Sequence, residues 1–171
     1  MKNFGFARGW LLFFVCLLVA LALPGGVAAS DSVWVKIQLV WGTDDAKSPD
    51  SRHHPVDDNL AKKLSSNKSP FRWKHYFEVN SQVVSIPLNE SRTGVKMSSH
   101  LTLDLKNLGK DKIETKLYGK GKALSTHRET VKKDWPLILA GNAENETAWL
   151  VVITKMDPPS KEATTTAGGP K

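Results

Sequence analysis

The stretch that decides the fold is residues 33–41, which read VWVKIQLVW. Its odd-numbered residues are all apolar, whereas the even positions include Trp34, Lys36 and Gln38. An alternation with a period of two is typical of a half-buried β-strand, because successive side chains of a strand point to opposite faces. We therefore expect a strand over 33–41 whose odd-numbered residues face the core.

Similar short runs recur along the chain, separated by turn-forming residues. The expected strands cover residues 33–41, 71–79, 82–86, 95–106, 112–118, 122–131, 135–140 and 148–154. Asn80 and Ser81 are expected to form a tight turn. The run at 148–154 is apolar at both parities, which predicts a central strand covered on both faces. The polar run at 122–131 predicts a sheet edge.

One short helix is expected beside these strands. A polar loop covers 42–55, and Asp57 or Asp58 is placed to cap a helix over 59–65. The residues expected to dock this helix against the sheet are Val56, Leu60 and Leu64.

The order of elements predicts an all-β fold with one short helix. Strands that follow one another through turns, without intervening helices, favour an antiparallel β-sandwich or meander of about eight strands. A small OB-like barrel is the alternative.

The first 29 residues have the order of an export signal. Lys2 and Arg8 precede a charge-free apolar run at 10–23, and small residues follow at 27–29. The run of 14 residues is shorter than the roughly 20 that a membrane-spanning helix needs. We expect residues 1–29 to be a cleaved signal peptide and the protein to be periplasmic or extracellular, with a retained anchor as the alternative. No transmembrane segment is expected after its removal.

The chain that follows the leader is expected to form one domain and a tail. Cys16 is the chain's single cysteine and lies in the leader, so a core without disulfides must hold residues 30–156 together as a single β-rich domain. Residues 157–171 read DPPSKEATTTAGGPK and offer nothing large and apolar to bury, which predicts a disordered tail.

The charge of the chain favours anionic partners. The formal net charge is +7, and it is +5 without Lys2 and Arg8. A moderate positive field attracts lipid headgroups or acidic polysaccharide. Nucleic acid is not expected as a partner, because an exported protein seldom meets it.

Neither a metal site nor a cofactor is predicted. His53 and His54, with Asp57 and Asp58, form the one local cluster of ligand types. Adjacent histidines on an extended chain point in opposite directions, and no further ligand follows at a zinc-site spacing. We interpret the cluster as a solvated loop with a helix cap.

The sequence gives only weak evidence for a catalytic group of residues. The pairs that could be assembled are Ser98 or Ser99 with His100 and Asp104, and Ser125 with His127. There is no Gly-x-Ser-x-Gly motif to position a serine nucleophile. An enzyme is therefore less favoured than a protein that binds without catalysis.

Aromatic and basic residues indicate a candidate binding face. Trp34 and Lys36 share one face of the first strand, and Lys74 and Tyr76 share the polar face of the expected strand at 71–79. If the two faces coincide, they form an exposed patch of the kind that binds sugars, peptides or partner subunits. The alternative is that the helix or the 42–55 loop covers them.

Three functions are consistent with these observations. The first is an exported, non-enzymatic binding module or accessory subunit of a cell-envelope assembly, with a protein or a glycan as its partner. The second is a secreted or periplasmic hydrolase with dispersed catalytic residues. The third is an envelope structural protein that assembles by strand addition at an open sheet edge.

Overall fold

The computed structural model describes residues 32–66, 69–143 and 147–159. Contacts divide the chain into Met1–Ser30 and Asp31–Lys171, and every described residue belongs to the second unit. The expected signal peptide at 1–29, with Cys16, and most of the expected tail lie outside the described residues. Within the described ranges, no helix is long and apolar enough to cross a membrane.

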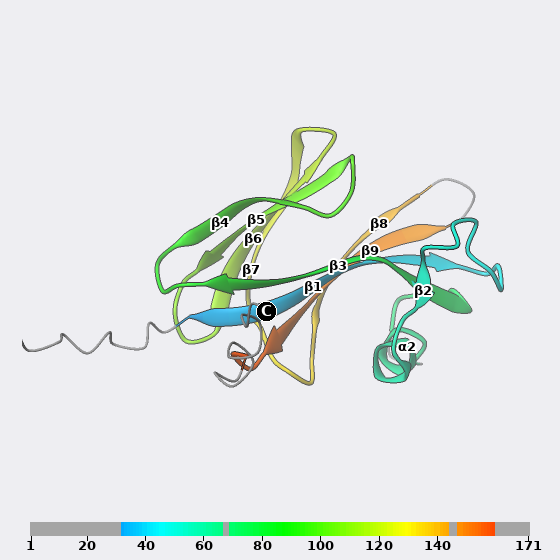
Figure 1. Ribbon diagram of the computed structural model, residues 1–171, viewed down its shortest axis with the longest axis horizontal. Coiled ribbons are helices and arrows are strands. Elements are labelled where there is room, and N and C mark those ends of the chain that lie inside the picture. Colours follow the sequence, from blue (N-terminus) through cyan, green and yellow to red (C-terminus); the bar gives the residue numbers. More distant parts are fainter. Residues whose placement is uncertain (1–31, 67–68, 144–146, 160–171) are drawn as a thin grey trace, which may run out of the picture. The chain divides into compact units, whose positions relative to one another are not determined.

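The described residues form two antiparallel sheets and one helix (Figure 1). The elements are β1 (Val33–Thr43), β2 (His54–Pro55), α2 (Asp58–Leu64), β3 (His75–Ile86), β4 (Ser91–Lys96), β5 (Leu101–Asn107), β6 (Lys112–Gly119), β7 (Lys122–Thr130), β8 (Leu137–Asn142) and β9 (Ala148–Met156). Sheet A has the order β2-β3-β1-β9-β8, and sheet B has the order β4-β5-β6-β7. The predicted all-β class is confirmed, and these strands form no closed barrel.

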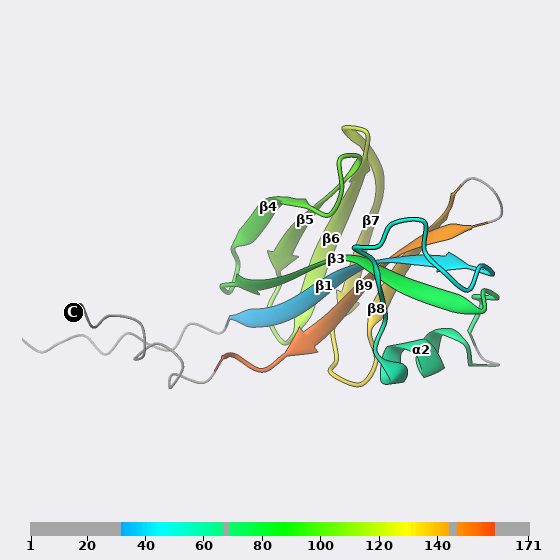
Figure 2. The same ribbon diagram turned by 45° about the vertical axis from the view of Figure 1, so that its right-hand side comes forward.

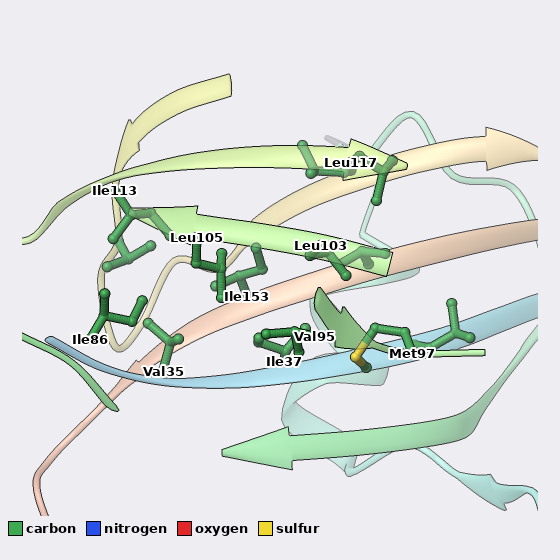
Figure 3. Packing of buried hydrophobic residues seen from close by; sticks show 14 of the residues in the cluster. Val35, Ile37, Ile86, Val95, Met97, Leu103, Leu105, Ile113, Leu117 and Ile153 are labelled. Atoms are coloured by element: carbon green, nitrogen blue, oxygen red, sulfur yellow. The ribbon is translucent and has the colours of Figure 1, made fainter. Parts of the chain in front are cut away.

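Both sheets contribute side chains to one shared core, which we call the sandwich core. Ile37 of β1 and Ile153 of β9 pack with Leu103, Leu105 and Ile113 of sheet B (Figure 3). All five are at most 1% exposed. The odd-numbered residues of the 33–39 stretch line this core, as their period predicts.

A second cluster, the helix core, lies on the opposite face of sheet A. Helix α2 lies beside sheet A (Figure 2), and its Leu60 and Leu64 pack there with Val40 of β1. The helix begins at Asp58, one residue before the predicted start, and of the two predicted caps it uses Asp57, whose side chain accepts a hydrogen bond of 2.9 Å from the Leu60 backbone amide. This bond satisfies one of the amide groups that a helix start leaves without a partner.

Strand β9 is buried on both faces, and this confirms its predicted central position. Val151 and Ile153 face the sandwich core, whereas Leu150 and Val152 face the helix core. A strand between two apolar layers needs apolar residues at both parities. That requirement explains the continuous run at 148–154.

The predicted turn at Asn80 and Ser81 is wrong. The chain continues through both residues as one strand, β3, which pairs with β1 from His75 to Ile86. The pairing with β1 contains a β-bulge next to Asn80. Leu39 pairs with Asn80 and Val40 pairs with Glu78, so one residue of β3 between them has no partner on β1. The ladder with β1 outweighs the local preference of an Asn-Ser pair for a turn.

The single strand predicted over 95–106 is also wrong, because a hairpin separates β4 from β5. The Ser98 hydroxyl accepts hydrogen bonds from the backbone amides of His100 at 3.2 Å and Leu101 at 3.1 Å. Serine competes with a strand ladder in this way by bonding to its own neighbouring backbone. Ser98, one of the two serines considered for a catalytic pair with His100, therefore shapes a turn.

Candidate functional site

The structure does not bring the predicted binding residues together. Trp34 pairs with Ser85 of β3 and Tyr76 pairs with Gly42 of β1. The eight-residue offset along β1 separates the two aromatic residues by roughly 26 Å at about 3.3 Å per residue. Trp34 is half-buried.

Tyr76 lies in the helix core, so of the two expectations for this residue the one in which the helix covers it holds. Its side chain is 5% exposed, and its hydroxyl donates to the Leu64 carbonyl oxygen at 3.4 Å. Burial raises the pKa of the Tyr76 hydroxyl. The expected alternation over 71–79 fails because β3 begins only at His75, which leaves Phe71 and Trp73 free to pack on the same side as Tyr76.

The two lysines of the predicted face also lie apart from one another. Lys36 on β1 forms an ion pair of 3.7 Å with Glu78 of β3. Lys74 is exposed just before β3, where its backbone amide donates to Asp44 at 3.0 Å. The structure therefore places Trp34 and Lys36 near one end of β1 and Lys74 and Tyr76 near the other.

The four residues considered as metal ligands have different structural roles. His54 is exposed on β2 and pairs with Glu78, while Asp57 caps α2 and Asp58 lies in its first turn. His53 is turned toward the loop, with its Nδ1 at 2.7 Å from the Ser48 hydroxyl oxygen. No group of three metal-ligating side chains occurs in the part of the chain that the structure describes.

Ser48, Asp50 and His53 form a serine–histidine–aspartate contact that the sequence analysis missed. The His53 Nε2 lies 3.7 Å from Asp50 Oδ2, opposite its contact with Ser48. Arg52 holds Asp50 with two nitrogens and keeps the pKa of its carboxyl far below the usual range. The Ser48 hydroxyl also accepts from the Asp50 amide at 3.3 Å, so this set ties the loop together.

Three cavities lie elsewhere on the described surface. The first, of about 510 Å³, is polar and lies beside Lys36 and the start of α2. Two of its three lysines are paired with acids, since Lys36 pairs with Glu78 and Lys133 pairs with Asp157 at 2.5 Å. The third, of about 360 Å³, opens between the sheets near Leu101. None of the three is lined by the Ser48 loop.

The second cavity, of about 620 Å³, is an apolar groove between α2 and the start of β8. Its apolar lining consists of Pro70, Phe71, Trp135, Pro136, Leu137 and Ile138. We call it the Trp135 groove, because Trp135 is 73% exposed at its margin. Lys62 and Lys63 also line it. The sequence analysis did not predict this site, although the pair Trp135-Pro136 directly before β8 could have indicated an exposed aromatic residue at a strand end.

Strand β8 forms the edge of sheet A beside this groove. It reads LILAGN and contains no charged residue or proline. The predicted edge strand of sheet B, β7, is confirmed, and it carries Lys122, Arg128 and Glu129. Charges and prolines are the usual devices that keep sheet edges from pairing with other chains.

The edges formed by β3 of sheet A and β4 of sheet B are occupied by side chains and by β2. The Gln82 side chain donates to the Lys96 carbonyl oxygen at 2.6 Å, and Arg92 donates to the Ser85 carbonyl oxygen at 3.0 Å. Strand β2 pairs with β3 near Phe77. Among the edges of the described sheets, β8 is therefore the one without such protection.

In a comparison with known proteins, no family model, no curated protein and no solved structure matches the chain.

Proposed function

We propose that this chain is an exported, non-enzymatic binding module that holds an extended segment of a partner protein along β8, as an accessory subunit of a cell-envelope assembly. The observation that carries the proposal is the uncharged edge of β8 next to an exposed tryptophan. Export rests on the signal-peptide pattern of residues 1–29.

A polypeptide is the partner that fits this edge. One side of β8 pairs with β9, so its other side presents main-chain N–H and C=O groups that an added strand can satisfy. An added segment would extend sheet A beyond β8 and place its side chains toward the Trp135 groove. Main-chain bonds would then provide affinity, and the groove would select the side chains.

Trp135 has the properties of an interface anchor. At 73% exposure it contributes little to the fold, and buried tryptophans are common among the residues that dominate binding energy. Phe71 and Ile138 are half-buried, line the same groove and provide the apolar surface that a partner side chain would cover.

Peptides selected from a phage-displayed random library on the purified protein test the proposal. Their binding to Trp135→Ala should weaken by about 2 kcal/mol or more. Ala140→Lys places a charge on the exposed edge of β8 and should also abolish binding. Ala123→Lys, an equally exposed position on edge strand β7, is the matched control and should leave binding unchanged.

Amide hydrogen exchange locates the bound peptide. We expect slower exchange within Leu137–Asn142 when the selected peptide is present, because added main-chain bonds protect the strand. Selected peptides that tolerate Ala140→Lys, or that protect only other strands, would contradict the proposal. Failure to enrich any peptide would contradict it as well.

A further inference from the structure

The net charge of this chain is concentrated in one sheet. Residues 91–131, which form β4 to β7, contain nine lysines and arginines against four acidic residues, a net charge of +5. The whole chain after residue 29 also carries +5. The remaining residues after the leader are therefore balanced, and the excess belongs to sheet B.

The strand register gathers five of these nine cations on the outer face of sheet B. The inward side chains of β5 and β6 alternate with outward ones, so Lys106 pairs with Glu114, and Glu114 pairs with Arg128. The cations of this outer surface, which we call the basic face, are Lys96, Lys106, Lys112, Lys116 and Arg128. All five are exposed.

The two acidic residues of the basic face are engaged by neighbouring groups. Glu114 lies 2.6 Å from the Arg128 Nε and 3.7 Å from the Lys116 Nζ, and Arg128 lowers the pKa of its carboxyl. Asp104 accepts a hydrogen bond of 2.8 Å from the Gly94 amide. No ion pair within the described residues involves Lys96, Lys106 or Lys112, and these ammonium groups face solvent.

The basic face is an uncovered surface of sheet B. Helix α2 packs on sheet A, and no described element lies over the outer face of sheet B (Figures 1 and 2). Its charged residues line none of the three cavities. Adjacent strands lie about 4.8 Å apart and alternate residues along a strand about 6.6 Å apart. The surface therefore presents a repeated array of charge, which suits an extended polymer better than a small molecule.

We propose that the basic face binds a linear acidic polysaccharide. The large apolar residues that the structure exposes are Val83, Leu88, Leu124, Trp135 and Met156, and none of them belongs to this face. Binding to a lipid surface draws on buried apolar area as well as on charge, so a soluble polyanion fits better. The expected export of the chain favours a polysaccharide over nucleic acid. This binding is independent of the partner proposed for β8.

Binding of the purified protein to heparin and to alginate, with dextran as the uncharged control, tests the proposal. We expect both anionic polysaccharides to bind and dextran not to bind. Because cations are released from a polyanion when it binds lysines, log affinity should fall linearly with log salt concentration. Replacing Lys106 and Lys112 together by glutamine should reduce the slope and lower the affinity about tenfold or more.

The matched control replaces Lys47 and Lys74 by glutamine, because both are exposed outside sheet B and the change in net charge is the same. This variant should bind nearly as well as the native chain. An equal loss in both variants would show attraction by net charge alone and would overturn the proposal. So would stronger, lysine-dependent binding to duplex DNA or to phosphatidylglycerol vesicles. Trp135→Ala should not change polysaccharide binding, which keeps this test separate from that of β8.

Discussion

The close contact between Gly141 of β8 and the Trp149 ring of β9 leads to a specific prediction. Gly141 pairs with Trp149, and the indole ring of Trp149 lies over it. A Cβ atom at position 141 would lie 2.1 Å from Cζ2 and 2.4 Å from Cε2 of that ring. Carbon atoms in favourable contact are about 3.5 Å apart or more, so Gly141→Ala requires the ring to move by roughly 1.4 Å.

The size of the effect follows from the packing of Trp149. The ring packs against the sandwich core and is half-buried, so its displacement disrupts contacts of the core. Overpacking of this kind costs about 1–3 kcal/mol. Alanine recovers about 0.5–1 kcal/mol relative to glycine inside a strand. We expect Gly141→Ala to lower the free energy of unfolding by about 1–2 kcal/mol.

A double-mutant cycle isolates the contact between the two residues. Trp149→Ala alone should cost about 3 kcal/mol, because a large partly buried ring is removed. In that background Gly141→Ala meets no ring and should be neutral or stabilising by up to about 1 kcal/mol. Urea denaturation of the four proteins, followed by circular dichroism, measures all the terms. Additive effects would refute the reasoning that the ring requires a glycine beneath it.

Three further predictions concern the core, the helix and the leader. Ile153→Ala should lower the free energy of unfolding by about 2–5 kcal/mol in urea denaturation, because Ile153 is fully buried; Leu124→Ala, at a residue 54% exposed, should change it by less than about 0.5 kcal/mol. Asp57→Ala should lower the free energy of unfolding by about 1 kcal/mol, because it removes the cap of α2. Asp58→Ala should lower it clearly less, and thermal melts of the two variants measure the difference. The mature chain should begin near Ser30, which N-terminal sequencing of the exported protein measures. A chain that retains Met1 and stays with membranes would indicate an anchor.

Part of the candidate site could not be predicted from the sequence. Trp34 and Tyr76 share a polar parity within their own strands, but parity says nothing about where two strands meet. The pairing of Gly42 with Tyr76 places the tyrosine under α2, far from Trp34. The exposed position of Trp135 likewise depends on which strand ends sheet A.

The sequence by itself determined the features that depend on neighbouring residues. The alternation in 33–39 specified which side chains of β1 face the sandwich core, and the apolar run at 148–154 specified a strand covered on both faces. The adjacent carboxylates of Asp57 and Asp58 specified the start of α2 to within one residue. Each of these follows from side-chain period or from a hydrogen bond within a few residues.

The tertiary structure alone decided the features that depend on pairing between distant segments. The ladder between β1 and β3 overrode the turn preference of Asn80, because consecutive main-chain bonds outweigh one local preference. The order of sheet A left β8 as an uncharged edge. Register across β4 to β7 gathered lysines that are interleaved with acids along the chain onto one face, since antiparallel pairing sets alternate residues of different strands side by side.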